Sequence, residues 1–280
     1  FAADLRIETL RHDALAAMWR RPPEGNPLFN VPGSLAAKLS LVGETLSVSD
    51  ATLTIDETPV PFATEIGFEP ATRHLNIHAD LGALDEGHSR ALLALMPDLR
   101  SDATFGVSFP TGLFDLSAET LTVEGLSGRG LVAKGTWAGG VLALQDLRAD
   151  DFGGMRVTAG LTAFGTIQKP ELSGTLDVAV ARANAPALGR LFDALGTPPV
   201  AREWLTQWLP ANLSVGLDAP SGEGGQGLGV TGKVGAADLT VEAKLGVGVM
   251  RALEGPMSIR LDLRSDDPAA LTAQLGLGDI

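Results

Sequence analysis

ELSGTLDVAVARANAPALGRLFDALG (171–196) and MSIRLDLRSDDPAALTAQLGLG (257–278) decide the fold, because each is an alternating strand that leads into a helix with proline in its first turn. Their prolines, Pro186 and Pro268, lie 268 − 186 = 82 residues apart. This spacing belongs to whole supersecondary units rather than to single strands. The two copies predict a modular β array.

The composition also favours many short strands. The 280 residues include 34 glycines and 17 prolines, which favour tight turns, whereas only 5% are aromatic. Cysteine is absent. Disulfides, thiolate zinc sites and cysteine nucleophiles are therefore excluded, and the redox compartment is left open.

The charge excludes several partners. The net charge is −13 at pH 7, and the 21 basic residues form no patch. We therefore expect no nucleic-acid binding and no polybasic membrane contact, because both need clustered Lys and Arg. No apolar stretch reaches the roughly 18 residues of a transmembrane helix, and the start lacks a signal-peptide layout. Because the sequence begins at Phe1, we expect a segment of a larger protein whose anchor lies outside it.

Strand blocks alternate with short helical blocks along the chain. After an opening strand at 2–8, the spacing of apolar residues predicts helices at 12–19, 85–97, 184–196 and 200–210, and a last helix capped by Asp266 or Asp267. Glycine pairs at 139–140 and 153–154 predict turns. We expect three approximate units: a strand block plus helix at 1–99, a strand block plus two helices at 100–210, and a strand block plus helix at 211–280.

Several strands have one apolar and one polar face. In LTVEAKLGVGV (239–249) every second residue is apolar, whereas Thr240, Glu242 and Lys244 occupy the other face. Such strands are typical of antiparallel sheets, since strands of parallel α/β sheets tend to be apolar on both faces. The residues predicted to line the shared apolar face are Leu172, Leu176, Val178, Val180, Leu239, Val241, Ala243, Leu245, Val247, Ile259, Leu261 and Leu263.

Alternation indicates burial but not what covers the buried face. On the pattern alone, a filled sandwich or barrel is favoured over a face that binds a ligand. The helices are likewise interpreted as covers of sheet ends or seams. Leu188, Phe192, Trp204 and Trp208 would then be packing residues rather than a ligand box.

Three stretches together resemble a known family: the alternating β blocks, the segment DFGGMRVTAGLTAFGTIQKPELSGTLDVAVARANAPALGRLFDAL (151–195), and WLTQWLPANLSVGLDA (204–219). They are similar to the AsmA-like proteins of Gram-negative envelopes. The segments WRRPPE (19–24) and EWLTQWLPANL (203–213) most resemble its large members related to YhdP and TamB. The resemblance covers most of the chain and rests on pattern and short phrases.

The resemblance implies an elongated, curled β-sheet with an apolar groove, built of repeating units with crossing or capping helices. It implies a periplasmic protein, anchored in the inner membrane, that carries phospholipid towards the outer membrane. The expected partners are phospholipid acyl chains and envelope proteins of the two membranes. The alternatives are a structural or assembly factor for outer-membrane proteins, which would offer sheet edges for strand addition, and a filled β domain without ligand.

Glycine motifs give no convincing nucleotide site. Gly222, Gly224 and Gly227 have GxGxxG spacing, but a strand-like segment follows instead of a helix that could hold pyrophosphate. Residues 227–233 fit the start of a phosphate loop, yet Val234 replaces the Ser or Thr that would hold magnesium. Both are interpreted as turns or strands.

Other polar residues also lack a catalytic pattern. His74 and His78 would lie on one side of a strand about 13 Å apart, too far to share a zinc ion. Asp150–Asp151 and Asp266–Asp267 are interpreted as turn and cap residues, and the segment 87–90 lacks the GxSxG form. We therefore predict a non-enzymatic protein without metal or cofactor.

Overall fold

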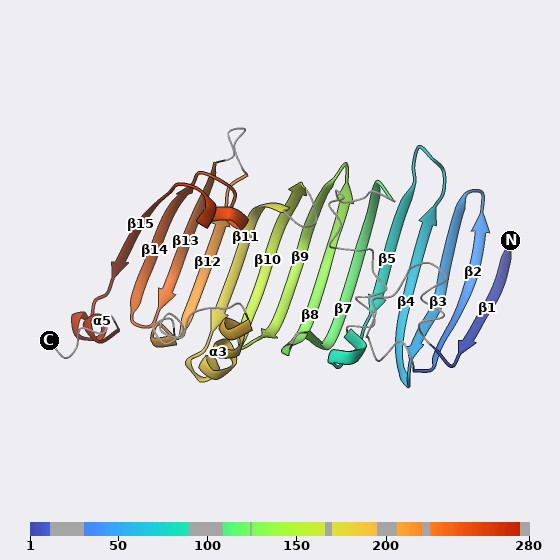
Figure 1. Ribbon diagram of the computed structural model, residues 1–280, viewed down its shortest axis with the longest axis horizontal. Helices are drawn as coiled ribbons and strands as arrows, with labels where there is room; N and C mark the ends of the chain where they lie inside the picture. The colour runs from blue at the N-terminus through green and yellow to red at the C-terminus, as the bar shows by residue number, and fades with distance from the viewer. Residues whose placement is uncertain are drawn as a thin grey trace. The chain divides into compact units, whose positions relative to one another are not determined.

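The computed structural model describes residues 1–11, 31–89, 109–123, 125–165, 170–194, 206–219 and 225–274, which are mainly β-strand (Figure 1). The chain divides into two compact units. Unit 1 comprises residues 1–145 and 164–168, and unit 2 comprises residues 146–163 and 169–280. The boundary therefore runs through β9 (Val141–Phe152) and β10 (Met155–Gly165).

Unit 1 contains an open sheet with strand order β1-β2-β3-β4-β5-β7-β8. The bounds are β1 (Ala2–Thr9), β2 (Gly33–Val42), β3 (Thr45–Ile55), β4 (Thr58–Gly67), β5 (His74–Asp80), β6 (Ala83–Leu84), β7 (Thr111–Val123) and β8 (Leu126–Ala138). Successive strands are antiparallel, except that β5 and β6 pair with β7 in parallel. The predicted antiparallel pairing therefore does not hold at β7, because the long stretch of chain between β5 and β7 allows a parallel crossover.

Unit 2 has an entirely antiparallel order over β11 to β15. The strands are β11 (Pro170–Val180), β12 (Ala211–Leu217), β13 (Gln226–Val234), β14 (Ala237–Leu245) and β15 (Met257–Arg264). The helical elements are η2 (Arg182–Asn184), α3 (Ala185–Ala194), η3 (Val249–Glu254) and α5 (Pro268–Gln274). The predicted strand–helix copies are confirmed as β11 followed by α3 and β15 followed by α5.

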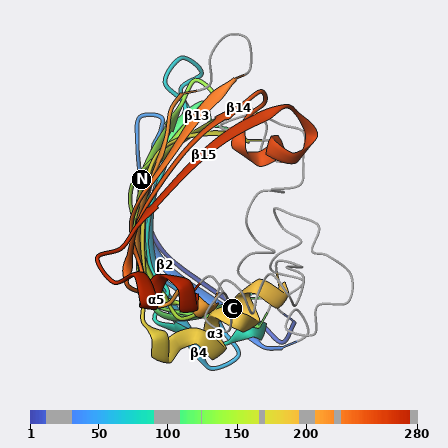
Figure 2. The ribbon, with the colours of Figure 1, turned by 90° about the vertical axis from the view of Figure 1, so that its left-hand side faces the viewer.

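Strands in each unit bend along their length, so the part of the sheet in each unit has a concave and a convex face (Figure 2). The prediction of a mainly β fold, with a curled open sheet and short helices, is confirmed. Within the described residues, no helix has both the length and the apolar character needed to cross a membrane.

The turns lie where the local sequence predicts them. Both predicted glycine pairs form turns, with φ of +59° and +80° at Gly139 and Gly140 and of +58° and +89° at Gly153 and Gly154. Positive φ at both central positions is the geometry that glycine supplies in two-residue hairpins.

The predicted helices are only partly within the described chain. Residues 86–89 are helical, and the Asp85 carboxylate accepts the His88 backbone N–H at 2.9 Å, as a cap does. α3 begins after Asn184, and its Leu188 is buried. Other parts of the predicted helices lie outside the described residues, namely 12–19, 90–97 and 195–205, which include Trp204. The side chains of Leu191 and Phe192 also lie outside them.

Two glycines permit close contact between neighbouring strands of unit 2. Gly174 and Gly232 have φ of +126° and +152° inside β11 and β13. A Cβ atom at Gly232 would collide with the backbone carbonyl of Asn212, and one at Gly174 with that of Gly160. A residue with a side chain at either position would therefore clash with rigid backbone and would have to adopt an unfavourable φ.

We expect Gly232→Ala to lower the free energy of unfolding by roughly 1–3 kcal/mol, because the positive φ is unfavourable for alanine and the new methyl group collides with the Asn212 carbonyl. Gly229→Ala in the same strand is the control, since a Cβ there meets no atom within 4 Å. Urea denaturation checks both variants. Equal stability of the two would contradict this account of Gly232.

Candidate functional site

The cross-strand register of unit 2 aligns apolar residues in rows that run across the strands. One row joins Leu176, Val215, Val230, Val241 and Leu261. The rows on either side are Val178, Leu213, Gly232, Leu239 and Leu263, and Gly174, Leu217, Leu228, Ala243 and Ile259. Directly opposed residues in antiparallel strands share a face, so these three rows form one surface, here called the apolar face.

Burial on the apolar face is incomplete. Most side chains of the three rows are half-buried. On β15, Ile259 and Leu261 keep 59% and 61% of their surface exposed. A filled core would bury aliphatic side chains of this size almost completely. The described part of the chain therefore leaves this surface partly open.

Gln226 and η3 cover one end of the apolar face. The Gln226 side chain is 4% exposed and lies opposite Leu245 in the register. Its amide nitrogen donates to the carbonyls of Leu172 at 2.5 Å and Asp218 at 2.8 Å, and its oxygen accepts the Val249 N–H at 2.8 Å. Because η3 begins at Val249 and contacts β11, it lies on the apolar side, which is the concave face in Figure 2.

The opposite end of the strands is closed by a fully buried row. It consists of Val180, Ala211, Val234 and Ala237, each no more than 8% exposed. Two hydrogen bonds to backbone carbonyls hold the entry to β12 against this end. The Arg182 guanidinium donates to the Leu209 carbonyl at 2.5 Å, and the Gly235 N–H donates to the Pro210 carbonyl at 2.7 Å.

Most of the predicted lining residues do share this surface. Leu176, Val178, Leu239, Val241, Ala243, Ile259, Leu261 and Leu263 lie in the three rows, and Val180 and Leu245 lie at the closed ends. Leu172 lies on β11, where its carbonyl binds Gln226. Val247 is different, because β14 ends at Leu245 and Val247 lies in the following loop beside Gly255.

The predicted strand block after residue 210 contains β12 and β13, but the predicted lining residues include none from these two strands. Leu213, Val215 and Leu217 alternate along β12, as do Leu228 and Val230 along β13. That alternation was visible in the sequence, but glycines dilute it. Gln226 was also missed, since no local pattern marks a buried amide that joins three distant segments.

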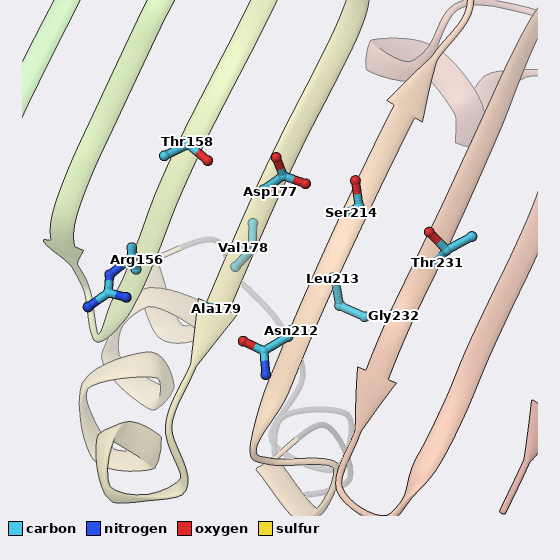
Figure 3. Close-up of a pocket in the computed structure, with 10 residues that line it drawn as sticks. All are labelled: Arg156, Thr158, Asp177, Val178, Ala179, Asn212, Leu213, Ser214, Thr231 and Gly232. Atoms are coloured by element: carbon cyan, nitrogen blue, oxygen red, sulfur yellow. The ribbon is translucent and has the colours of Figure 1, made fainter.

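The other face of unit 2 is polar. Figure 3 shows a shallow depression there, bordered by exposed side chains from four strands. They are Arg156 and Thr158 of β10, Asp177 of β11, Asn212 and Ser214 of β12, and Thr231 of β13. The small residues Ala179 and Gly232 lie between them. Val178 and Leu213 also line this depression, so its lining is not polar alone.

The histidines of β5 make separate contacts. His74 Nε2 lies 3.2 Å from Glu65 Oε1, and its Nδ1 lies 2.9 Å from the Thr72 carbonyl oxygen. His78 lies 4.0 Å from Asp115 on the next strand. The Thr72 carbonyl and then Glu65 raise the pKa of His74, because both stabilise the imidazolium. The described residues contain no cluster of His, Asp and Glu able to hold a metal ion.

The remaining motifs have structural positions. Residues 227–233 lie within β13, so the glycine run forms a strand, and 222 and 224 lie outside the described residues. Asp151 accepts the Gly154 N–H at 2.9 Å in the β9–β10 turn, and Asp267 directly precedes α5. The Asp85 pKa is lowered, chiefly by the His88 backbone N–H.

Comparisons with protein-family models, with curated proteins and with solved structures find no match to this chain. The family resemblance of the sequence therefore stays a prediction.

We expect Gln226→Leu to lower the free energy of unfolding by about 2–3 kcal/mol, because two part-buried carbonyls and one N–H lose their partner. Exchange of the Val249 amide hydrogen should become faster, since it donates to Gln226. The control is Gln207→Leu at an exposed position. Unchanged Val249 exchange would contradict this role for Gln226.

His74 should titrate in NMR spectra with a pKa above its ordinary value of 6.5. Its contribution to stability should be fully present below pH 6.5 and should be lost as pH rises through the raised pKa. Glu65→Gln should lower the His74 pKa, whereas Glu57→Gln at an exposed turn should leave it unchanged. An identical His74 pKa in both variants would show that Glu65 has no such effect.

Proposed function

We propose that the apolar face of unit 2 binds phospholipid acyl chains. On this proposal, the chain is a non-enzymatic segment of a periplasmic protein, anchored in the inner membrane, that carries phospholipid between the inner and outer membranes. It would thereby support outer-membrane biogenesis and lipid homeostasis. The observation that supports this most is a continuous surface of aliphatic side chains that remain half-exposed.

The closed strand ends indicate the direction in which an acyl chain would lie. η3 and Gln226 occupy one end of the apolar face, and the buried row from Val180 to Ala237 occupies the other. An acyl chain would therefore run across the strands, along the three rows. Four intervals between neighbouring strands give about 19 Å for this path at roughly 4.8 Å each.

Hydrophobic transfer would supply the binding energy. Each methylene taken out of water contributes about 0.8 kcal/mol. Gly174, Gly232 and Ala243 contribute little volume to the rows, which leaves room beside the larger side chains. Head groups would remain in water. Because the contact is non-directional, a lipid could move along the rows without an energy source in this segment.

The sequence resemblance to AsmA-like proteins favours the same function. The alternative of an assembly factor is favoured by β15, whose outer edge is unpaired among the described residues and could accept a strand. A filled β domain without ligand is less compatible with the exposure of Ile259 and Leu261. Bound lipid distinguishes the conduit from both alternatives.

We expect Val241→Asp to abolish lipid occupancy, because it places a carboxylate in the central row. Thr240→Asp is the control on the opposite face of β14. Both variants and the wild type would be purified without detergent, and mass spectrometry of organic extracts would measure the lipid. The β signal in circular dichroism should persist in both variants.

Stoichiometric phospholipid in wild type and Thr240→Asp, and none in Val241→Asp, supports the proposal. A lipid-free extract from folded wild type contradicts it. Equal lipid in all three samples would place the lipid somewhere other than the apolar face.

A further inference from the structure

The outer edges of β1 and β15 are unpaired among the described residues, and they present opposite sets of backbone groups. Gly246 N–H donates to the Pro256 carbonyl, and in this register the even-numbered residues of β15 bond to β14. The N–H and C=O groups of Met257, Ile259, Leu261 and Leu263 therefore point away from β14. These are also the apolar residues of the strand.

On β1 the even-numbered residues, rather than the odd-numbered ones, have outward backbone groups. Phe1 and Leu41 exchange backbone hydrogen bonds at 2.7 and 2.9 Å, so the odd-numbered residues of β1 bond to β2. The outward N–H and C=O groups belong to Ala2, Asp4, Arg6 and Glu8. On this strand the outward groups therefore lie mainly on polar residues.

Two properties restrict how the two edges can pair: which residues have outward backbone groups, and which residues have apolar side chains. In a parallel pair, a residue with outward groups lies opposite a residue whose own groups point the other way. Apolar residues of β15 would then lie opposite the apolar residues Ala3, Leu5 and Ile7 of β1. An antiparallel β1–β15 pair would instead set apolar against polar residues. A parallel pair is compatible with this fold, since β5 and β7 already form one.

One parallel register matches every charge. It places Arg260 opposite Asp4, Asp262 opposite Arg6, and Arg264 opposite Glu8 of a second copy. In the same register, Ile259, Leu261 and Leu263 lie opposite Ala3, Leu5 and Ile7. The Leu261 N–H would donate to the Asp4 carbonyl, and its C=O would accept the Arg6 N–H.

The charged groups are accessible for this pairing. Arg264 and Arg6 side chains are both 80% exposed, and each already forms an ion pair within its own strand, to Asp262 at 2.8 Å and to Glu8. A second strand would place each carboxylate between arginines of the two strands. Opposed charges on neighbouring strands stabilise a sheet, whereas like charges destabilise it.

We propose that β15 of one copy pairs in parallel with β1 of a second copy in this register, so that copies associate head to tail. Paired residues share a face, so the apolar face of unit 2 would continue into the apolar residues of β1 in the next copy. Such a contact is heterologous, so each copy keeps a free β1 or β15 edge that can bind a further copy. The inference is independent of the proposed lipid function.

Charge reversal tests the pairing in sedimentation velocity runs over a concentration series. Arg260→Asp or Asp4→Arg should each lower the association constant about tenfold, because each sets like charges opposite one another. The double variant R260D/D4R should associate like wild type, as should an equimolar mixture of the two single variants. Lys233→Asp, an exposed charge on the same face of β13, is the control and should change nothing.

The double variant separates this pairing from symmetric ones. An antiparallel β15–β15 dimer would set Arg260 against Asp262, and a β1–β1 dimer would set Asp4 against Arg6. Both would be weakened in R260D/D4R without recovery. Failure of the double variant to recover, or a monomeric wild type throughout the series, therefore overturns the proposal.

Cross-linking tests the register directly, because the chain contains no cysteine. Ser258→Cys and Ala2→Cys would be opposite each other, and neighbouring strands about 4.8 Å apart allow a disulfide. Mixing these variants under oxidising conditions should give a disulfide-linked pair. Ala3→Cys, shifted by one residue to the other face, should not cross-link with Ser258→Cys. Equal yields from both mixtures would exclude this register.

Discussion

An unbroken antiparallel register from β11 to β15 is the constraint on which unit 2 depends. Because side chains alternate between faces, a slip of one residue in any pair would move its apolar residues to the polar side. All four strand pairs keep continuous registers. Unit 1 contrasts with this, since its β2–β3 and β3–β4 pairs each contain a register shift. At one of these shifts Asp50 has a φ of +46° and binds Lys38 at 2.7 Å.

Burial in unit 2 is concentrated at the strand ends, so the well-packed residues are separate from the partly exposed ones. Gln226 and the row from Val180 to Ala237 are buried, whereas most side chains in the rows between them are half-exposed. The ends can hold the sheet in register while the middle keeps apolar surface available. Leaving that surface in water costs free energy, which an acyl chain would recover. Folding and lipid binding would thus use different parts of one face.

The edges of the sheet follow from the same alternation. An unpaired strand with apolar residues on one face is prone to pair with other chains, and charged side chains are the usual protection. Here the charges on β1 and β15 alternate in sign, as Asp4, Arg6 and Glu8 and as Arg260, Asp262 and Arg264. With alternating signs, most registers set like charges opposite one another and only a few set opposite charges together. The same residues can therefore limit non-specific pairing and select a specific partner.

Local chemistry in the sequence determined the strands, the glycine turns at 139–140 and 153–154, and the start of α3 and α5, because alternation, positive φ and proline act within a few residues. It also determined that Leu176, Val241 and Leu261 face the same way on their own strands. Only the tertiary structure decided that these residues form one row, that β5 and β7 run parallel, and that β14 stops before Val247. It alone placed the Gln226 amide between Leu172, Asp218 and Val249. These features depend on pairing between residues far apart in the chain, and single-strand periodicity carries no information about which strands become neighbours.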